Sequence, residues 1–231
     1  MKIIAIIPAR YGSKRLLAKP LLKINNKPLV QLTYEAVLSS RLFDDVFIAT
    51  ESKKIYQVVS EFGGQCIMTS EYCENGTERC AELINNLDFH NNDLIINIQC
   101  DEPFIQKKHL KSLINLFEKN AEIGTLLSPI KDNDIKDPSI VKAVKKEDNN
   151  VIDFSRKKSN LNIKSKLYKH IGIYGYRKKT LLEIAVLKKT KRELIEQLEQ
   201  LRWVENNYKI SAALVLEDLI SINTENDIKK L

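Results

Sequence analysis

Four cationic side chains follow a short apolar segment near the start of the chain, in the run "IIPARYGSKRLLAKPL" from Ile6 to Leu21. The run also contains Gly12 and Ser13, whose backbone N–H groups can face a phosphate in a turn. The side chains that can neutralise phosphate oxygens are Arg10, Lys14, Arg15 and Lys19. The pattern predicts a triphosphate-binding loop, and the alternative is a solvated basic loop.

Two other phosphate-binding motifs do not occur in the sequence. No Gly-x-Gly-x-x-Gly follows an apolar segment, and no Gly-x-x-x-x-Gly-Lys-Ser/Thr is present. These absences disfavour a nicotinamide-dependent enzyme and a P-loop ATPase.

The acidic residue Asp101 follows a second apolar segment, Leu94–Ile98. A carboxylate at the end of a buried strand can bridge a hard cation to triphosphate oxygens. Asp101 is therefore the predicted ligand of a hard metal cation, and the alternative is a strand-end carboxylate that caps the next helix. The neighbouring Glu102 is predicted to be structural, or to support the metal ligand without contacting the metal.

Strand-like and helix-like segments alternate through the first half of the chain. Strands are expected at Ile3–Ile7, Val46–Ala49, Cys66–Met68 and Leu94–Ile98, and helices near 28–40, 53–62, 79–85 and 108–118. This alternation predicts an α/β fold of three layers, with a mostly parallel, Rossmann-like sheet and helices on both faces. Ligands in such folds lie beyond the carboxyl ends of the strands, where the cationic loop is expected.

The alternation changes after Ile123–Pro129. Strands without intervening helices are expected at Val141–Lys145, Val151–Phe154 and Tyr168–Tyr176, followed by a helix over Glu193–Glu205, a strand over Ile210–Leu216 and a short terminal helix. Because no linker-like segment is visible, the sequence predicts a single domain over 1–231 with an antiparallel insertion at about 130–180.

The composition is that of a globular protein, with 43% hydrophobic and 29% charged residues and a net charge of +7. The basic clusters lack interleaved aromatics and zinc-ligand spacing, so a nucleic-acid partner is not expected. None of the four cysteines forms a Cys-x-x-Cys pair, and no apolar run is long enough for a signal sequence or a membrane span. The expected location is the cytoplasm, with reduced thiols and no membrane partner.

The cationic segment resembles the signature of sugar nucleotidyltransferases. In the form "IPARYGSKRLLAKPL" it is most similar to the cytidylyltransferases that activate 3-deoxy-manno-octulosonate (Kdo), the CMP-Kdo synthetases. The same resemblance extends along the chain, in the family's order, through "ENGTERCAEL" at Glu74, "NIQCDEPFI" at Asn97, "KHIGIYGYR" at Lys169 and "IEQLEQLR" at Ile195.

The resemblance implies a nucleotidyltransferase fold and a magnesium-dependent reaction of CTP with Kdo, which gives CMP-Kdo and diphosphate for lipopolysaccharide synthesis. It also implies a homodimer. Within the cationic loop, Arg10 and Lys19 are expected to stabilise charge on the α-phosphate and the departing diphosphate. Lys14 and Arg15 are expected to hold the outer phosphates.

The resemblance assigns further residues to each substrate. Gly76, Thr77 and Arg79 match the family's nucleotide-base loop, although Thr77 can also be read as a helix cap. The residues implied for the acidic sugar are Gln99, His170 and Glu196, with Arg156 as a partner for its carboxylate. A histidine in an apolar strand is commonly a hydrogen-bonded core residue, and a glutamate on a helix is commonly solvated. For both residues the alternative is therefore a role outside the site.

The chain departs from the family pattern at the second metal ligand. An aspartate is expected where this chain has Asn223, whose amide oxygen can coordinate magnesium but brings no negative charge. The nearby Asp227 is better explained by a capping box with Thr224. Other departures are Ser70 and Cys73 for an arginine and a histidine, Asn75 for a serine, and Cys100 for a glycine.

These departures leave two alternatives open. The acceptor can be another keto-sugar acid, such as 8-amino-Kdo or a nonulosonic acid. The chain can also be a weakened paralogue that binds nucleotide without turnover. A purely structural protein of the same fold is disfavoured by the ordered set of polar motifs.

Overall fold

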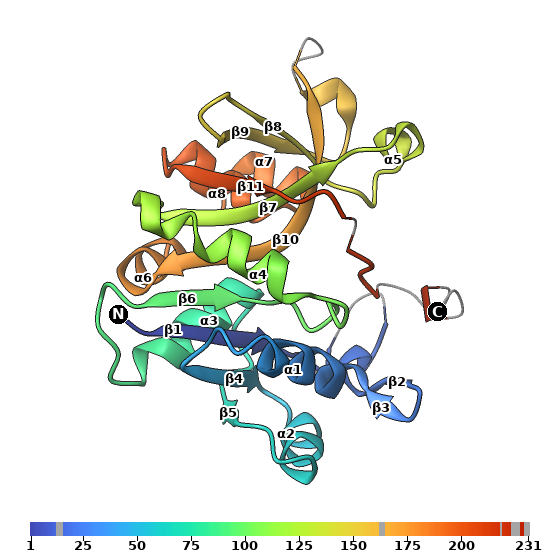
Figure 1. The fold of residues 1–231 in the computed structure, drawn as a ribbon, viewed down its shortest axis with the longest axis vertical. Coiled ribbons are helices and arrows are strands. Elements are labelled where there is room, and N and C mark those ends of the chain that lie inside the picture. Colours follow the sequence, from blue (N-terminus) through green and yellow to red (C-terminus); the bar gives the residue numbers. More distant parts are fainter. Residues whose placement is uncertain (13–15, 162–164, 218, 223–226, 229–231) are drawn as a thin grey trace. The chain divides into compact units, whose positions relative to one another are not determined.

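The structure is a computed structural model that describes residues 1–12, 16–161, 165–217, 219–222 and 227–228 (Figure 1). The chain divides into two compact units. The first comprises Met1–Leu110, Arg177–Ala185 and Leu219–Leu231, and the second comprises Lys111–Tyr176 and Val186–Asp218. The insertion expected at 130–180 falls mostly in the second unit.

The sheet of the first unit has the strand order β5-β4-β1-β6. Its strands are β1 (Ile3–Pro8), β4 (Asp45–Thr50), β5 (Cys66–Met68) and β6 (Leu94–Asn97), and each neighbouring pair is parallel. Residues 4–7 of β1 are fully buried. A strand without apolar–polar alternation is typical of a parallel sheet covered on both faces, so the prediction for this half of the chain is confirmed.

The connections of the first unit are mostly helical. They include η1 (Lys19–Leu21), the hairpin strands β2 (Lys23–Ile24) and β3 (Lys27–Pro28), α1 (Leu29–Ser39), α2 (Lys53–Glu61), α3 (Gly76–Asn85) and α6 (Lys178–Ala185). The boundary between the units falls within α4 (Lys107–Ile114). Helix α2 begins as expected, because the side chain of Ser52 accepts a hydrogen bond from the Ile55 N–H, and Gly63 follows it with a φ of 76°. Helices α1 and α3 both pack on β1 and β4, on opposite faces in Figure 1.

The strand order places a topological switch point between β1 and β6. The chain moves outward from β1 to β4 and β5, and then crosses back to β6 on the other side of β1. Connections that leave in opposite directions open a crevice at the carboxyl ends of the two central strands. The predicted cationic loop follows β1, and Asp101 follows β6.

The second unit has the strand order β10-β7-β11-β9-β8, and β10 also pairs with β8. Its elements are η2 (Phe117–Lys119), β7 (Ile123–Pro129), α5 (Asp132–Lys136), β8 (Lys142–Lys145), β9 (Asn150–Ser155), η3 (Lys158–Asn160), β10 (Leu167–Arg177), α7 (Lys191–Glu196), α8 (Gln200–Glu205) and β11 (Ile210–Leu214). Strands β11 and β7 are parallel, and the other pairs are antiparallel. The antiparallel strands expected after residue 140 are therefore present.

The helix expected over Glu193–Glu205 is wrong, because the segment forms two short helices. A capping box between Thr190 and Glu193 starts α7, and Gln197 ends it with a φ of 53°. The side chain of Arg202 on α8 then bonds back to Glu193 on α7. This buried ion pair favours a bend over a continuous helix, which the apolar periodicity alone could not show.

Within the part of the chain that the structure describes, no helix is long and apolar enough to cross a membrane.

Candidate active site

The candidate site of the first unit lies at the carboxyl ends of β1 and β6. The Ile98 N–H donates to the Ile6 carbonyl at 3.0 Å, which keeps these strand ends level. Beyond β1, Arg10 is exposed and its Nη1 lies 3.5 Å from the Glu74 carbonyl. Gly12 is also exposed, with open space where a side chain would begin. The predicted residues Ser13, Lys14 and Arg15 lie outside the described residues.

Lys19 and Asp101 contact each other directly. Lys19 Nζ lies 2.5 Å from Asp101 Oδ2, and the two side chains are 12% and 23% exposed. Lys19 begins η1 directly after Ala18, which has a left-handed φ of 53°. The fold therefore brings together two of the three predicted catalytic residues, Lys19 and Asp101. Arg10 instead contacts the segment that leads into the base loop.

Backbone interactions hold Asp101 in place. The Glu102 N–H donates to the Gln99 carbonyl at 3.1 Å in a turn. The buried Thr33 hydroxyl on α1 donates to the Cys100 carbonyl at 2.7 Å. Helix α4 begins only at Lys107, so the alternative interpretation of Asp101 as a cap for that helix does not describe the structure.

The C-terminal segment binds to the same turn. The Ile222 N–H donates to the Asp101 carbonyl at 2.9 Å, and the Ser221 hydroxyl donates to Glu102 Oε1 at 2.5 Å. Glu102 is 5% exposed, so its side chain has the predicted structural role. Asn223, the predicted second metal ligand, follows Ile222 in sequence and lies outside the described residues.

Helix α3 begins inside the predicted base loop. Its N-cap is Asn75, whose Oδ1 accepts a hydrogen bond from the Glu78 N–H at 2.8 Å. The reading of Thr77 as the cap is therefore wrong, and Thr77 lies in the first helical turn with an exposed fraction of 2%. The substitution of asparagine for the family's serine keeps a capping side chain at this position.

Gly76 makes a close approach between segments. A Cβ at this position would lie 3.1 Å from Cγ of Pro8 and 3.2 Å from Nε2 of Gln99. Gln99 is itself oriented by a 2.9 Å hydrogen bond from its Nε2 to Oδ1 of the buried Asn97. The fold therefore brings Gly76 and Gln99 together at the end of β6.

Arg79 is buried under the base loop, with an exposed fraction of 3%. Its guanidinium lies 3.1 Å from Glu51 Oε2 and donates to the Thr69 hydroxyl at 2.5 Å. It also donates to the carbonyls of Ser70 and Cys73 at 3.3 and 3.5 Å. The resemblance implies a nucleotide contact for Arg79, and the structure surrounds it with protein oxygens that shape the loop.

Ser70 and Cys73, which differ from the family pattern, both hydrogen-bond to the carboxylate of Glu82. Glu82 Oε1 accepts from the Ser70 N–H at 2.7 Å, and Oε2 accepts from Cys73 Sγ at 3.0 Å. Burial, with the neighbouring Glu82, raises the pKa of the Cys73 thiol to about 12. Burial also raises the pKa of Cys100 well above its usual value. Both thiols are therefore protonated at neutral pH and are poor nucleophiles.

Glu196 and Arg156, both predicted to contact the sugar, bind each other in the second unit. The Arg156 N–H donates to Glu196 Oε2 at 3.0 Å, and Oε1 accepts from the Ser155 hydroxyl at 2.8 Å and from Asn160 Nδ2 at 2.5 Å. Burial acts to raise the pKa of Glu196, but these hydrogen bonds outweigh it and the pKa is lowered. Glu196 is therefore ionised at neutral pH.

The guanidinium of Arg156 also has internal partners. Its Nε donates to the Glu196 carbonyl at 3.0 Å, and Nη1 donates to the carbonyls of Pro138 and Ser139, each at 3.2 Å. The sequence could not show this, because backbone acceptors carry no residue-type signal. Arg156 thus orders the segment before β8 in addition to any contact with a ligand.

His170 sits in an aromatic setting on β10. Its Nε2 lies 3.1 Å from the Thr125 hydroxyl, and its ring centroid lies 5.0 Å from that of Phe154 and 5.4 Å from that of Tyr174. Burial lowers the pKa of His170 to about 3, so the imidazole is neutral at physiological pH. Gln99 belongs to the first unit, whereas Arg156, His170 and Glu196 belong to the second.

The carboxylate oxygens of Asp101 suit a hard cation better than a soft one. Among the described residues, no group of three or more His, Cys, Asp or Glu side chains could hold a metal. Within the same residues, Asp101 Oδ1 has no hydrogen-bond partner, whereas Oδ2 binds Lys19. One carboxylate with ligands from phosphate oxygens and water is a common arrangement for magnesium.

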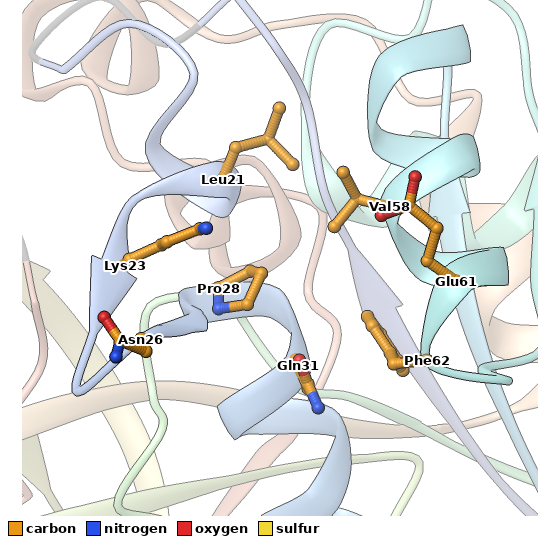
Figure 2. A pocket seen from close by; sticks show the side chains of 8 residues that line it. All are labelled: Leu21, Lys23, Asn26, Pro28, Gln31, Val58, Glu61 and Phe62. Carbon is orange, nitrogen blue, oxygen red and sulfur yellow. The ribbon is translucent and has the colours of Figure 1, made fainter.

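A separate surface pocket lies between the β2–β3 hairpin, α1 and α2 (Figure 2). Its walls combine Lys23 on one side and Glu61 on the other with the apolar side chains of Val58 and Phe62. It contains none of the predicted site residues.

The chain resembles proteins of known activity over its whole length. Residues 4–210 match the family profile described as "Cytidylyltransferase". A relative from Parabacteroides distasonis, "3-deoxy-manno-octulosonate cytidylyltransferase", is 40% identical and covers 100% of this chain and 96% of its own. A relative from Shewanella pealeana, "8-amino-3,8-dideoxy-manno-octulosonate cytidylyltransferase", is 37% identical and covers 99% and 96%.

Solved structures agree with these sequence matches. The structure of CMP:2-keto-3-deoxy-manno-octonic acid synthetase complexed with CTP superposes with a TM-score of 0.91 at 33% identity, and covers 100% of this chain and 96% of that chain. A 4-diphosphocytidyl-2C-methyl-D-erythritol synthase from Anaerococcus prevotii shares the fold, with a TM-score of 0.64 at 17% identity. The parallel sheet, the cationic loop after β1 and the carboxylate after β6 thus occur in a chain that belongs to the cytidylyltransferase family, as a nucleotidyltransferase of the CMP-Kdo synthetase type.

Proposed function

We propose that the protein transfers the cytidylyl group of CTP to an eight-carbon keto-sugar acid, with Kdo as the first candidate, and releases diphosphate. The observation that carries the proposal is the Lys19–Asp101 pair at the switch point, where a cation and a carboxylate from segments far apart in sequence converge. Relatives named for Kdo and for 8-amino-Kdo support the acceptor class. The CTP named in the similar solved structure supports the donor.

The chemistry requires two anions to meet in line. The anomeric hydroxyl of the sugar attacks the α-phosphorus, the bond to the diphosphate oxygen breaks, and the hydroxyl proton is released. Such transfers depend on positioning and charge neutralisation more than on covalent catalysis. In this proposal Arg10 and Lys19 neutralise the α-phosphate and the leaving group. Gly12, Ser13, Lys14 and Arg15 hold the outer phosphates.

Asp101, together with Asn223, is proposed to hold a magnesium ion, which when bound neutralises charge on the phosphate oxygens. Asp101 has a second role through its own contacts. Its Oδ2 holds the ammonium group of Lys19 in place before any substrate arrives, at 2.5 Å. Preorganised charge of this kind lowers the cost of reorganisation during the reaction.

The base and sugar residues are proposed with distinct roles. Gly76 and Thr77 present the first turn of α3 to the cytosine, and Arg79 shapes the loop behind them. For the sugar, Gln99 offers a side-chain amide at the end of β6. His170 offers an uncharged ring, because its lowered pKa excludes the imidazolium at neutral pH. Glu196 and Arg156 act on the sugar from their shared hydrogen-bonded cluster.

The experiment that tests this function is diphosphate release from CTP, with and without magnesium, against a panel of acceptors. The panel contains Kdo, 8-amino-Kdo and a nonulosonic acid. Release with Kdo at ordinary enzyme rates supports the proposal. A preference for 8-amino-Kdo would shift the acceptor and keep the reaction. Absence of release with every acceptor would overturn the proposed function.

The 8-amino acceptor is the second candidate. It is favoured by the relatives of that name and by the changed residues Ser70, Cys73 and Cys100 near the predicted site. A weakened paralogue is tested separately through Asn223→Asp. A large gain in turnover with that variant would identify an enzyme of reduced metal affinity.

A homodimer and a place in lipopolysaccharide synthesis in the cytoplasm complete the proposal. Helix α7 exposes two large apolar side chains, Leu194 at 61% and Ile195 at 81%. These are better interface candidates than Leu201 and Trp203 on α8, which are buried. The mass measured by light scattering tests this, and an Ile195→Glu variant should dissociate the dimer if α7 lies in its interface.

A further inference from the structure

Glu51 directly follows β4 and has two different partners, one for each carboxylate oxygen. Its Oε1 accepts a hydrogen bond from the Tyr11 backbone N–H at 2.7 Å. Its Oε2 lies 3.1 Å from Nη2 of Arg79, and the side chains of Arg79 and Glu51 are 4% and 18% exposed. The carboxylate therefore connects the segment after β1 with helix α3.

Tyr11, the first partner of Glu51, lies at the start of the cationic loop. While Glu51 accepts from its N–H, the Tyr11 carbonyl accepts from the Ala18 N–H at 2.9 Å. This second bond joins the two ends of the loop, and Lys19 follows directly after Ala18. A shift of the Tyr11 peptide would therefore move both the start of the loop and the lysine that pairs with Asp101.

Arg79, the second partner of Glu51, anchors the base loop. It donates to the Thr69 hydroxyl and to the carbonyls of Ser70 and Cys73, and it lies on the helix that begins at Gly76. These contacts fix the path of the chain into α3. Glu51 is therefore a link between the predicted phosphate-binding and base-binding segments.

We propose that Glu51 is a positioning residue for CTP: through Tyr11 and Arg79 it sets the spacing between the loop that binds the phosphates and the loop that binds the base. The inference rests on the proposed function. A carboxylate is suited to this role because one oxygen can accept from an amide while the other forms an ion pair with a guanidinium. A glutamine keeps one acceptor but turns an NH₂ group toward the guanidinium, so it cannot serve both partners.

The effect should appear in CTP binding. The triphosphate and the base of one CTP molecule must be held at the same time, so an altered spacing weakens one set of contacts whenever the other is made. Glu51→Gln should raise the dissociation constant for CTP on the order of tenfold. Glu51→Asp is too short to reach both partners and should resemble Glu51→Gln.

The test compares wild type, Glu51→Gln and Glu51→Asp with Glu35→Gln as a matched control. Glu35 forms an ion pair in the same unit, 2.7 Å from Lys27, and among the described residues its carboxylate bonds only to Lys27 and Gln31. Thermal unfolding without ligand first defines a temperature at which every variant is folded. Calorimetry with CTP and magnesium, and KM and kcat from diphosphate release, are then measured at that temperature.

A higher Kd and KM for CTP in both Glu51 variants, with the Glu35 control unchanged, is the expected result. The Glu51→Gln and Arg79→Lys changes should also be non-additive in CTP affinity, because either one breaks the same link. Folded Glu51 variants that bind CTP as tightly as wild type would overturn the inference, even if their unfolding temperature had fallen. Failure of the wild type to bind CTP or release diphosphate would instead contradict the proposed function.

Discussion

The two units each contain a close ion pair, and the pairs differ in how completely the protein surrounds them. Lys19 and Asp101 are joined at 2.5 Å in the first unit, with side chains 12% and 23% exposed. In the second unit Arg202 binds Glu193 through two hydrogen bonds of 2.8 and 2.5 Å, with side chains 2% and 7% exposed.

The remaining contacts explain the difference. Nη1 of Arg202 donates to the Leu187 carbonyl at 3.1 Å, and Glu193 also takes part in the capping box of α7. By contrast, Asp101 Oδ1 has no hydrogen-bond partner in the described part of the chain. A fully satisfied buried pair holds helices together, whereas a partly accessible pair at a strand end keeps capacity for a ligand.

The strongest challenge to this comparison is Asp101→Ala. If the pair serves catalysis, kcat/KM for diphosphate release should fall by about 10³-fold or more, because charge stabilisation and the proposed metal ligand are both lost. The free energy of unfolding should fall by only about 1 kcal/mol, since Lys19 is partly accessible to water. Undiminished turnover in this variant would remove the catalytic assignment. Glu35→Ala provides a control for loss of an exposed ion pair.

Glu193→Ala should show the opposite behaviour. It leaves the Arg202 guanidinium buried without its carboxylate, and the free energy of unfolding should fall by about 3 kcal/mol. Urea unfolding followed by circular dichroism measures this loss. A double substitution of Glu193 and Arg202 by leucine should recover much of it, because the charge is removed with its partner. A loss no larger than that of Asp101→Ala would contradict the comparison.

His170 tests how burial in the second unit affects stability at acid pH. Its pKa of about 3 in the folded state lies below the unfolded value near 6.5, so the unfolded state binds the proton first as the pH falls. Stability from this group is present above pH 6.5 and is lost progressively below it, by up to about 2 kcal/mol at pH 5. His170→Gln should flatten this part of the pH dependence, measured from urea midpoints at pH 5 and 7.5. An unchanged slope would show that the pKa of His170 is not lowered in the folded state.

The smallest expected effect is at Ala18. Its φ of 53° is unfavourable for a residue with a Cβ, and Lys19 follows it directly. Ala18→Gly should raise stability by about 0.5 kcal/mol, after the greater entropy of glycine in the unfolded chain is deducted. Differential scanning calorimetry can resolve the change. A clear decrease in stability would show that the Ala18 methyl group makes contacts that outweigh its backbone strain.

Local patterns predicted the elements well where one physical signal dominated. The apolar runs of β1 and β6 became buried parallel strands, and Ser52 became the cap of α2. The helix over Glu193–Glu205 was wrong because its apolar residues keep a helical period across the bend at Gln197. The N-cap of α3 is Asn75 and not Thr77. The sequence could not separate the two, because asparagine and threonine both favour the N-cap position.

Within the candidate site, residue types indicated which side chains carry the charge, but not which groups they face. Asp101 and the cationic loop were identified from sequence, whereas Glu51 was missed because an isolated glutamate after a strand has no distinctive spacing. Arg79 and Arg156 were recognised as functional cations, yet the structure shows that both bind protein oxygens extensively. The signal that could have found Glu51 is the buried arginine that needs a carboxylate partner.

The sequence by itself determined the alternating strands and helices of the first half of the chain, the cationic loop and its carboxylate, because hydrophobic period and residue type are local properties of the chain. Only the tertiary structure decided that Lys19 meets Asp101, that Glu51 joins Tyr11 to Arg79, and that Glu196 is held by Ser155, Arg156 and Asn160. These choices depend on which distant segments fold together. They also depend on how far each polar group is removed from water, because burial makes an unpaired charge costly and so selects its partner.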